Sequence, residues 1–356
     1  MCNSEQWLQT KRCGQEPRIR RYAGVSGVSQ RIRARRLDAL NIDAMIRNIG
    51  TAHSKFVAVI LCAITSVSAQ ETVNNPDIVM DLQWEIGSWT DIWRIGQFES
   101  AAVNSDVSYY IYLPPGYDAS DKRYPVVYWF HGAYGRPYSA TPVVKRLAAA
   151  ISAGEAMEMI VVSCLDPTGL SMWTDSKDGR LPMETVLIDE LIPHIDASYR
   201  TLSDRSGRGI EGFSMGGYGA AYLGFKYHQL FSSVSILAGA LHTPQTFRER
   251  RRAIFDNVFS GDTEYANARS PWTVIEKNAD AVRNKTSIRI FVGADDGLLD
   301  WNRNYHTQLD ELGIDHEWGV VPDSPHDLEI VMQNWDGDFF DHYRRAFADS
   351  ASGIRQ

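Results

Sequence analysis

Gly212-Phe213-Ser214-Met215-Gly216-Gly217 is the stretch of sequence that decides the fold. It follows a short strand-like piece, Gly209 to Glu211, and begins a helical stretch rich in small residues. A serine on a sharp turn from strand to helix has a strained backbone and an exposed oxygen, so its neighbours must be small. Gly212 and Gly216 meet that need, and the helix start places free N–H groups near the serine oxygen. We therefore predict that Ser214 is a nucleophile.

The acid that would support this serine is expected after a later strand. A hydroxyl is a weak nucleophile and needs a base, which in turn needs an orienting acid. In folds with this turn, the partners follow the serine in the order acid, then histidine. Ile288 to Val292 is predicted to be a buried strand, and Asp295 and Asp296 come directly after it. Two adjacent carboxylates cannot both face one imidazole, and position alone leaves both open.

The base is expected in the next strand-end loop. Glu317 to Val321 is the following predicted strand, and His326 lies in the loop after it. His306 falls inside a predicted helix and His316 begins a strand, so neither is at the carboxyl end of a strand. His326 is therefore predicted to be the base.

Backbone donors for an oxyanion are predicted from an earlier strand. Val126 to Phe130 runs directly into His131-Gly132-Ala133-Tyr134-Gly135. The backbone N–H groups of Ala133 and Met215 would together hold a tetrahedral oxyanion, and each such donor lowers the barrier by about 3 kcal/mol. We interpret His131 as a structural residue that braces this loop.

The remaining pattern predicts an α/β fold, with a mainly parallel central sheet and helices on both faces. The further predicted strands are Tyr109 to Leu113, Met159 to Cys164 and Ser233 to Leu237. The predicted helices are Val143 to Ile151, Glu184 to Ile195, Gly217 to Tyr227 and Asn302 to Leu312. No repeat or low-complexity linker follows residue 70, so residues 70–356 are expected to form a single domain. About Leu241 to Thr286 breaks the alternation, and is either an insertion beside the site or two surface helices without a role.

The N-terminal part carries an export pattern. Phe56 to Val67 is an apolar run preceded by Lys55 and followed by small residues, which is typical of a signal peptide. The run is shorter than the roughly 20 residues of a membrane span, so no stable membrane anchor is expected. We predict a signal peptide over 45–69 and interpret 1–44 as an upstream segment that is not translated. The expected location is secreted or periplasmic.

Charge and cysteine content restrict the partners. The whole chain has a net charge of −8, and residues 70–356 contain 25 Lys and Arg against 40 Asp and Glu, a net charge of about −15. A strongly acidic chain argues against nucleic acid as a partner. Cys164 is the only cysteine after residue 70, so no intrachain disulfide can form in that part. The predicted chemistry requires no metal and no organic cofactor.

Several ordered motifs together resemble a family of α/β-hydrolase esterases. They are Y-L-P-P-G-Y at 112–117, H-G at 131–132, W-x-D at 173–175, the helical stretch 184–195, the G-F-S-M-G-G turn and H-D at 326–327. This family includes feruloyl and acetyl-xylan esterases, formylglutathione hydrolase and the mycobacterial mycolyltransferases, and the resemblance covers roughly 105–347. It implies Ser214 as nucleophile, His326 as base, and Ala133 and Met215 as oxyanion donors. It also selects Asp296 over Asp295 as the acid.

The same resemblance implies the substrate class. A secreted relative of these enzymes would act on a small-molecule ester or on acetyl or feruloyl esters of plant polysaccharide. Tyr134, Trp173 and Trp301 are candidates to stack on a sugar or phenolic ring, with core or rim packing as the alternative. Two other functions stay open: an acyltransferase of the mycolyltransferase type, and a catalytically inactive secreted binding protein on the same fold.

Overall fold

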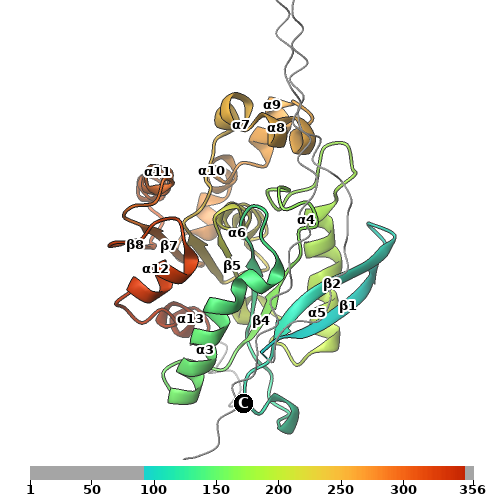
Figure 1. Cartoon of the computed structure of the whole chain (residues 1–356), viewed down its shortest axis with the longest axis vertical. Helices are drawn as coiled ribbons and strands as arrows, with labels where there is room; N and C mark the ends of the chain where they lie inside the picture. Colours follow the sequence, from blue (N-terminus) through green and yellow to red (C-terminus); the bar gives the residue numbers. More distant parts are fainter. Residues whose placement is uncertain (1–91, 349–356) are drawn as a thin grey trace, which may run out of the picture. The chain divides into compact units, whose positions relative to one another are not determined.

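Eight strands form a single sheet in the order β1-β2-β4-β3-β5-β6-β7-β8 (Figure 1). Their bounds are β1 Arg94–Ser100, β2 Ser105–Tyr112, β3 Val126–Phe130, β4 Ile160–Ser163, β5 Arg208–Phe213, β6 Ser233–Leu237, β7 Ser287–Gly293 and β8 Glu317–Val321. The computed structural model describes residues 92–348, all of which belong to one unit, Thr72–Gln356. The predicted signal peptide (45–69) and upstream segment (1–44) lie outside the described residues.

The sheet is parallel from β4 to β8 in its spatial order, and only β2 runs in the opposite direction, since it pairs antiparallel with both β1 and β4. The prediction of a mainly parallel α/β sheet is therefore confirmed. β1 was not predicted from the sequence, because its residues RIGQFES mix polar and apolar side chains without a buried run. β1 lies at the edge of the sheet and pairs with β2 alone. Its residues therefore show little of the apolar pattern by which a buried strand is predicted.

Alternate side chains of the central strands pack into two separate hydrophobic cores. On β3, Val126, Tyr128 and Phe130 point into the larger core, while Val127 and Trp129 point into the smaller one. Successive side chains of a strand face opposite sides of the sheet, and all five are buried, so both faces of β3 must be covered.

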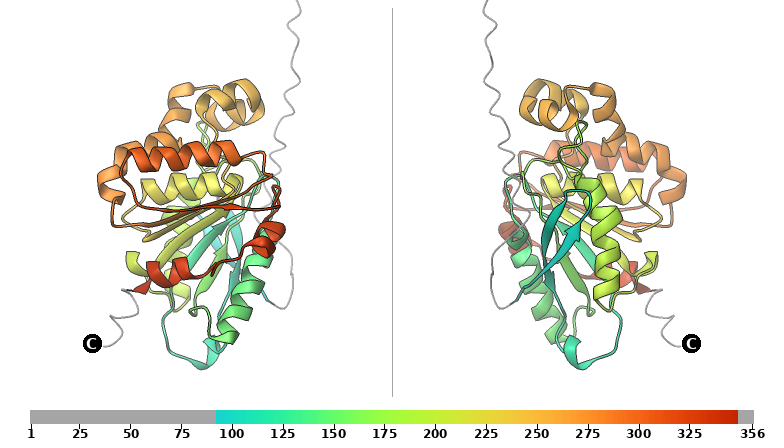
Figure 2. Two further views of the ribbon diagram at one scale, coloured as in Figure 1. Left: turned by 90° about the vertical axis from the view of Figure 1, so that its left-hand side faces the viewer. Right: turned by 90° about the vertical axis from the view of Figure 1, so that its right-hand side faces the viewer.

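Helices cover both faces (Figure 2). Their bounds are α3 Thr141–Ala153, α4 Met183–Thr185, α5 Ile192–Ser198, α6 Met215–Lys226, α7 Pro244–Arg250, α8 Arg252–Phe259, α9 Thr263–Ala268, α10 Pro271–Val282, α11 Leu299–Glu311, α12 Leu328–Asn334 and α13 Asp341–Ala346. A π-helical stretch, Val186–Leu191, joins α4 to α5. Apolar side chains of α3, α12 and α13 fill the smaller core, and those of α5, α6, α10 and α11 fill the larger core.

The segment after β6 contains four helices, α7 to α10, where the sequence analysis considered two. Its first residues are tied to the neighbouring strand end, because the N–H of Ala240 donates to the carbonyl of Ser214 at 2.8 Å. Since the carboxyl ends of parallel strands meet at one edge of the sheet, this segment begins beside the predicted site. Among residues 92–348, none of the helices combines the length and apolar character needed to cross a membrane.

Candidate active site

Ser214 occupies the sharp turn between β5 and α6. Its φ of 59° and ψ of −116° lie outside the usual regions for a non-glycine residue. The turn closes because its glycines allow backbones to touch: a Cβ on Gly212 would lie 2.2 Å from the carbonyl carbon of Gly216. A Cβ on Gly216 would lie 2.0 Å from the carbonyl oxygen of Phe130. Larger residues at either position would therefore displace the serine.

A hydrogen-bonded chain joins Asp296, His326 and Ser214. The Nε2 atom of His326 is 2.8 Å from Oγ of Ser214, and its Nδ1 atom is 2.7 Å from Oδ2 of Asp296. The Asp296 side chain is fully buried, and its other oxygen accepts the N–H of Leu298 at 2.7 Å. Asp295 is exposed and does not line the cavity in front of Ser214. The structure thus brings together Ser214, His326 and Asp296, the three residues selected from the sequence. Asp296, not Asp295, is the carboxylate hydrogen-bonded to His326.

The imidazole is held on its face as well as its edge. The ring of Phe213 stacks on that of His326, with 4.7 Å between centroids and 25° between planes. The side chain of His326 is still 37% exposed, so a substrate can reach it. A ring held by a carboxylate and an aromatic face keeps Nε2 directed at the serine.

Two residues that line the same cavity as Ser214 have N–H groups without an acceptor among the described residues. Met215 is the first residue of α6, so its N–H has no acceptor within the helix. The N–H of Ala133 forms no hydrogen bond with any described residue. Both residues line the cavity that contains Ser214 and His326. These N–H groups are therefore available to a developing oxyanion.

His131 braces the loop that carries Ala133. The ring is fully buried; its Nδ1 lies 2.8 Å from the carbonyl of Gly132, and its Nε2 accepts the N–H of Asp166 at 3.1 Å. These partners require a hydrogen on Nδ1 and a lone pair on Nε2. Burial lowers the pKa of His131 further, so the ring stays neutral. Its position agrees with the structural role inferred from the sequence.

The prediction that Trp173 contacts substrate is wrong. Its ring is fully buried, stacked on Phe130 with centroids 4.3 Å apart, and its Nε1–H donates to the carbonyl of His131 at 3.2 Å. The Trp173 side chain also fills the space beside Gly219, where an added Cβ would lie 2.5 Å from the Cβ of Trp173 and 2.6 Å from Cγ of its indole. Trp173 therefore supports the oxyanion loop from inside the core, and no ligand can stack on it.

A cavity of about 570 Å³ opens in front of Ser214. Tyr134 lines it and is 74% exposed, so it remains a candidate to contact a ring of the substrate. Trp301 does not line this cavity; its ring instead meets that of His242, with centroids 5.4 Å apart. The substrate-binding role predicted for Trp301 thus has no support from its position.

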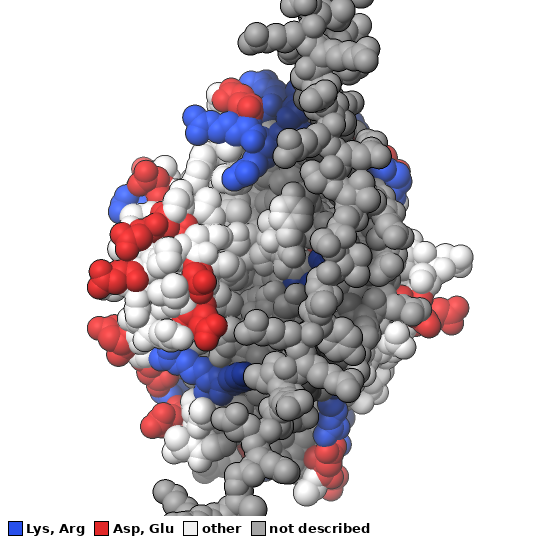
Figure 3. All heavy atoms as spheres, viewed as in Figure 1, with Lys and Arg blue, Asp and Glu red and all other residues white. Residues whose placement is uncertain are grey.

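Several residues that line this cavity were not predicted from the sequence. They are Leu170, Met172, Ala240, His242, residues 250–254, Gly297 and Leu298. His242 could have been found, because it follows β6 at the same edge of the sheet as the other strand-end residues. Residues 250–254 run from the last residue of α7 into the first turn of α8, and Figure 3 shows basic side chains gathered over that part of the molecule. No pattern in the sequence shows that this segment folds back to the serine.

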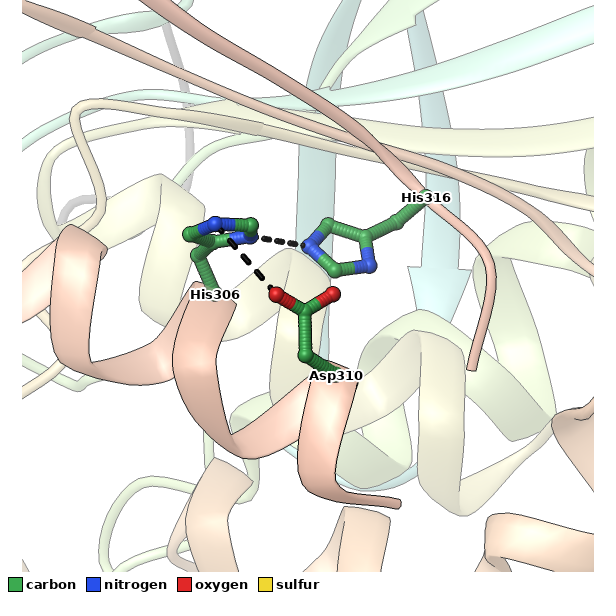
Figure 4. Close-up of side chains that lie close together, drawn as sticks. All are labelled: His306, Asp310 and His316. Atoms are coloured by element: carbon green, nitrogen blue, oxygen red, sulfur yellow. Dashed lines mark hydrogen bonds and ion pairs between the residues drawn. The ribbon is translucent and has the colours of Figure 1, made fainter. Parts of the chain in front are cut away.

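A second cluster of polar side chains lies on α11 and before β8 (Figure 4). His306 Nδ1 is 2.7 Å from Nε2 of His316, and His306 Nε2 is 3.5 Å from Asp310. These atom types are ones that zinc accepts. None of the three residues lines the Ser214 cavity. The cluster therefore has no part in the chemistry at Ser214.

Comparison with known proteins adds the family. The Esterase family model, described as "Putative esterase", matches residues 100–319. An esterase of Mycobacterium tuberculosis is 28% identical over 251 residues, which cover 64% of this chain and 54% of that protein. An endo-1,4-beta-xylanase/feruloyl esterase of Xylanibacter ruminicola is 30% identical over 168 residues, which cover 43% of this chain and 22% of that protein. The chain thus spans about half the length, or less, of these relatives.

A solved structure of a ferulic acid esterase superposes on this chain with a TM-score of 0.57. The two are 26% identical, and the match covers 68% of this chain and 93% of the other. The fold, the turn around Ser214 and the matched family model agree with one another. This chain belongs to the Esterase family of the α/β-hydrolase fold.

Proposed function

We propose that this protein is a serine carboxylic-ester hydrolase that works through an acyl-enzyme. The observation that carries this proposal is the chain from Asp296 through His326 to Ser214, with links of 2.7 and 2.8 Å. A hydroxyl hydrogen-bonded to an imidazole, which is in turn held by a buried carboxylate, is the arrangement that activates a serine.

The steps follow from the contacts. His326 Nε2 takes the proton of Ser214 as its Oγ attacks the ester carbonyl, and Asp296 stabilises the imidazolium that forms. The carbonyl oxygen becomes negative and is held by the N–H groups of Ala133 and Met215. His326 then gives its proton to the leaving alcohol, and an acyl group remains on Ser214. Water, activated by the same imidazole, releases the acid and restores the serine.

For the substrate, we propose acetyl or feruloyl esters of plant polysaccharide. The support comes from the relatives: one is named as a xylanase and feruloyl esterase, and a structure of similar fold is a ferulic acid esterase. The exposed Tyr134 at the cavity would stack on a phenolic ring or a sugar. Export through the segment 45–69 would place the enzyme where such polysaccharides occur, and we propose that it is secreted or periplasmic.

The test is hydrolysis of p-nitrophenyl acetate by the purified protein beside Ser214→Ala. We expect turnover by the wild type and a loss of several orders of magnitude in the variant. Acetylated xylan and methyl ferulate are then compared with the simple ester. Activity on p-nitrophenyl acetate alone would remove the polysaccharide part of the proposal. If the wild type and Ser214→Ala are both folded and equally inactive, the proposal that the protein is an ester hydrolase is overturned.

A further inference from the structure

Consecutive arginines form part of the wall of the Ser214 cavity. Arg250 ends α7, Arg252 begins α8, Arg251 lies between them, and all three are exposed. Arg252 is paired with Asp256, with 2.8 Å between Nε and Oδ2. By contrast, the side chains of Arg250 and Arg251 form no hydrogen bond or ion pair with any residue that the structure describes.

The charge of the cavity is therefore positive in a chain whose net charge is −8. Asp296 is the only acidic residue among the described residues of the cavity wall. Its carboxylate is already engaged by His326 and by the N–H of Leu298. Two guanidinium groups that pair with no carboxylate of residues 92–348 thus belong to the wall of the cavity that contains the serine.

His242 adds a buried polar atom to the same wall. The residue is only 7% exposed, and its Nδ1 atom is buried without a hydrogen-bond partner among the described residues. A buried polar atom that lacks a partner is destabilising. Burial and the charge of Arg251 lower the pKa of His242 to about 4, so the ring is neutral at neutral pH and carries one N–H. Because His242 lines the cavity, a substrate oxygen there can accept the N–H of the neutral ring.

The position of His242 relative to the serine is fixed through the backbone. Ala240, two residues earlier, donates its N–H to the carbonyl of Ser214 at 2.8 Å, and the N–H of His242 donates to the carbonyl of Ala240 at 2.7 Å. A group bound at His242 is consequently held within the same cavity as the reacting ester.

We propose that Arg250, Arg251 and His242 form a subsite for a negatively charged group of the ester substrate, a carboxylate in the first instance. Guanidinium groups bind carboxylates through paired, charge-assisted hydrogen bonds, and a neutral N–H beside them adds a third donor. The inference rests on the proposed esterase function and narrows its substrates to esters that carry an anion, such as the acylated form of an acidic sugar chain.

The test compares esters that differ only in charge. For an anion in the alcohol part, the pair is 4-acetoxybenzoate and 4-acetoxybenzamide; for one in the acyl part, it is mono-4-nitrophenyl adipate and its methyl ester. In one of the pairs, the wild type is expected to show a kcat/KM about tenfold higher for the anionic member. The preference should weaken as salt is raised from low ionic strength, since the arginines are exposed.

The double variant Arg250→Gln/Arg251→Gln should lower the ratio of anionic to neutral kcat/KM about tenfold. Arg248→Gln is the matched control, because Arg248 is exposed on the same α7 but does not line the cavity. It should leave the ratio unchanged. Circular dichroism and the melting temperature of each variant show that the fold is kept.

The outcomes separate the subsite from the esterase function. A preference lost in the double variant and kept in Arg248→Gln supports the subsite. Hydrolysis of neutral esters without any preference for charge overturns the subsite and leaves the function standing, as does an equal loss in the control. Without any hydrolysis, calorimetry on Ser214→Ala decides: tighter binding of 4-acetoxybenzoate than of the amide supports the subsite, and equal or absent binding overturns it.

Discussion

Gly293 packs directly against Ser324: a Cβ on the glycine would lie 1.9 Å from the serine's carbonyl oxygen. This contact joins the loop after β7 to the loop after β8. The first loop carries Asp296 and the second carries His326, so the absence of one side chain lets the acid reach the base.

Gly293→Ala should therefore separate the two loops and reduce kcat on p-nitrophenyl acetate about a hundredfold, since a displacement of about 1 Å at reacting groups has an effect of that size. Gly297→Ala is the control in the same loop, because a Cβ there meets nothing within 4 Å. Similar kcat values for the two variants would contradict the role of the Gly293 contact.

Asp296→Asn and Asp295→Asn form a matched pair of adjacent carboxylates. The amide at 296 would no longer hold Nδ1–H of His326 in the required tautomer, so we expect kcat to fall by about 10³ to 10⁴. Asp295 is exposed and outside the chain of hydrogen bonds, so its variant should stay within about twofold of the wild type. Steady-state kinetics on one simple ester measures both, and the opposite order of losses would reassign the acid.

His131→Phe tests the brace behind the oxyanion loop. Phenylalanine keeps an aromatic ring but loses the hydrogen bonds with Gly132 and with the N–H of Asp166. We expect kcat to drop about ten- to a hundredfold with little change in KM, because the oxyanion forms only as the bond is attacked. The shape of the pH–rate profile should not change, since His131 is neutral throughout. A shift of that profile would show that His131 takes part in proton transfer.

A buried ion pair next to the nucleophile turn should dominate stability. Glu211 and Arg289 are each 1% exposed, 2.6 Å apart, and the carboxylate also accepts hydrogen bonds from Ser235 and Tyr343. Arg289→Met leaves the carboxylate uncompensated and should lower the free energy of unfolding by about 3–5 kcal/mol. Urea unfolding measures this change.

The control for that experiment is Arg303→Met, which removes an exposed ion pair with Asp300. Exposed ion pairs contribute about 0–1 kcal/mol to the free energy of unfolding, so the urea unfolding curve of this variant should move little. An equal shift in the two variants would show that burial does not decide the contribution of Arg289.

His342 should make the protein less stable in mild acid. The ring is buried beside the Ser233 hydroxyl, and burial together with the charges of Arg289 and Arg345 lowers its pKa well below the usual value. The unfolded chain then binds more protons at low pH, so the free energy of unfolding falls as pH drops below about 6.5. His342→Gln removes this contribution. Between pH 7.5 and 5, the free energy of unfolding of the variant should therefore decline less steeply than that of the wild type.

Urea titrations at several pH values compare the two proteins. The carboxylates are common to both, so the difference between the curves isolates His342. Parallel curves would mean that His342 is not held neutral in the folded protein.

The sequence by itself determined the fold class and the positions from which the chemistry comes. Buried β-branched runs such as Val126–Phe130 and Ser233–Leu237 were found at their actual bounds, because their apolar pattern is local. The strand-end rule for parallel sheets placed Ser214, an acid at 295 or 296, and His326 at one edge, whereas the choice of Asp296 came from the family resemblance. The edge strand β1 was not predicted, because few of its side chains are buried.

Tertiary structure alone decided which side chains meet. Trp173 and Tyr134 were equal candidates in the sequence, yet one ring lies wholly inside the core and the other is 74% exposed at the cavity. Likewise, Arg250 and Arg251 reach the cavity only because α7 and α8 fold back over the strand ends. Local patterns specify helices and strands, whereas burial and contact depend on packing between segments far apart in the chain, which no local pattern encodes.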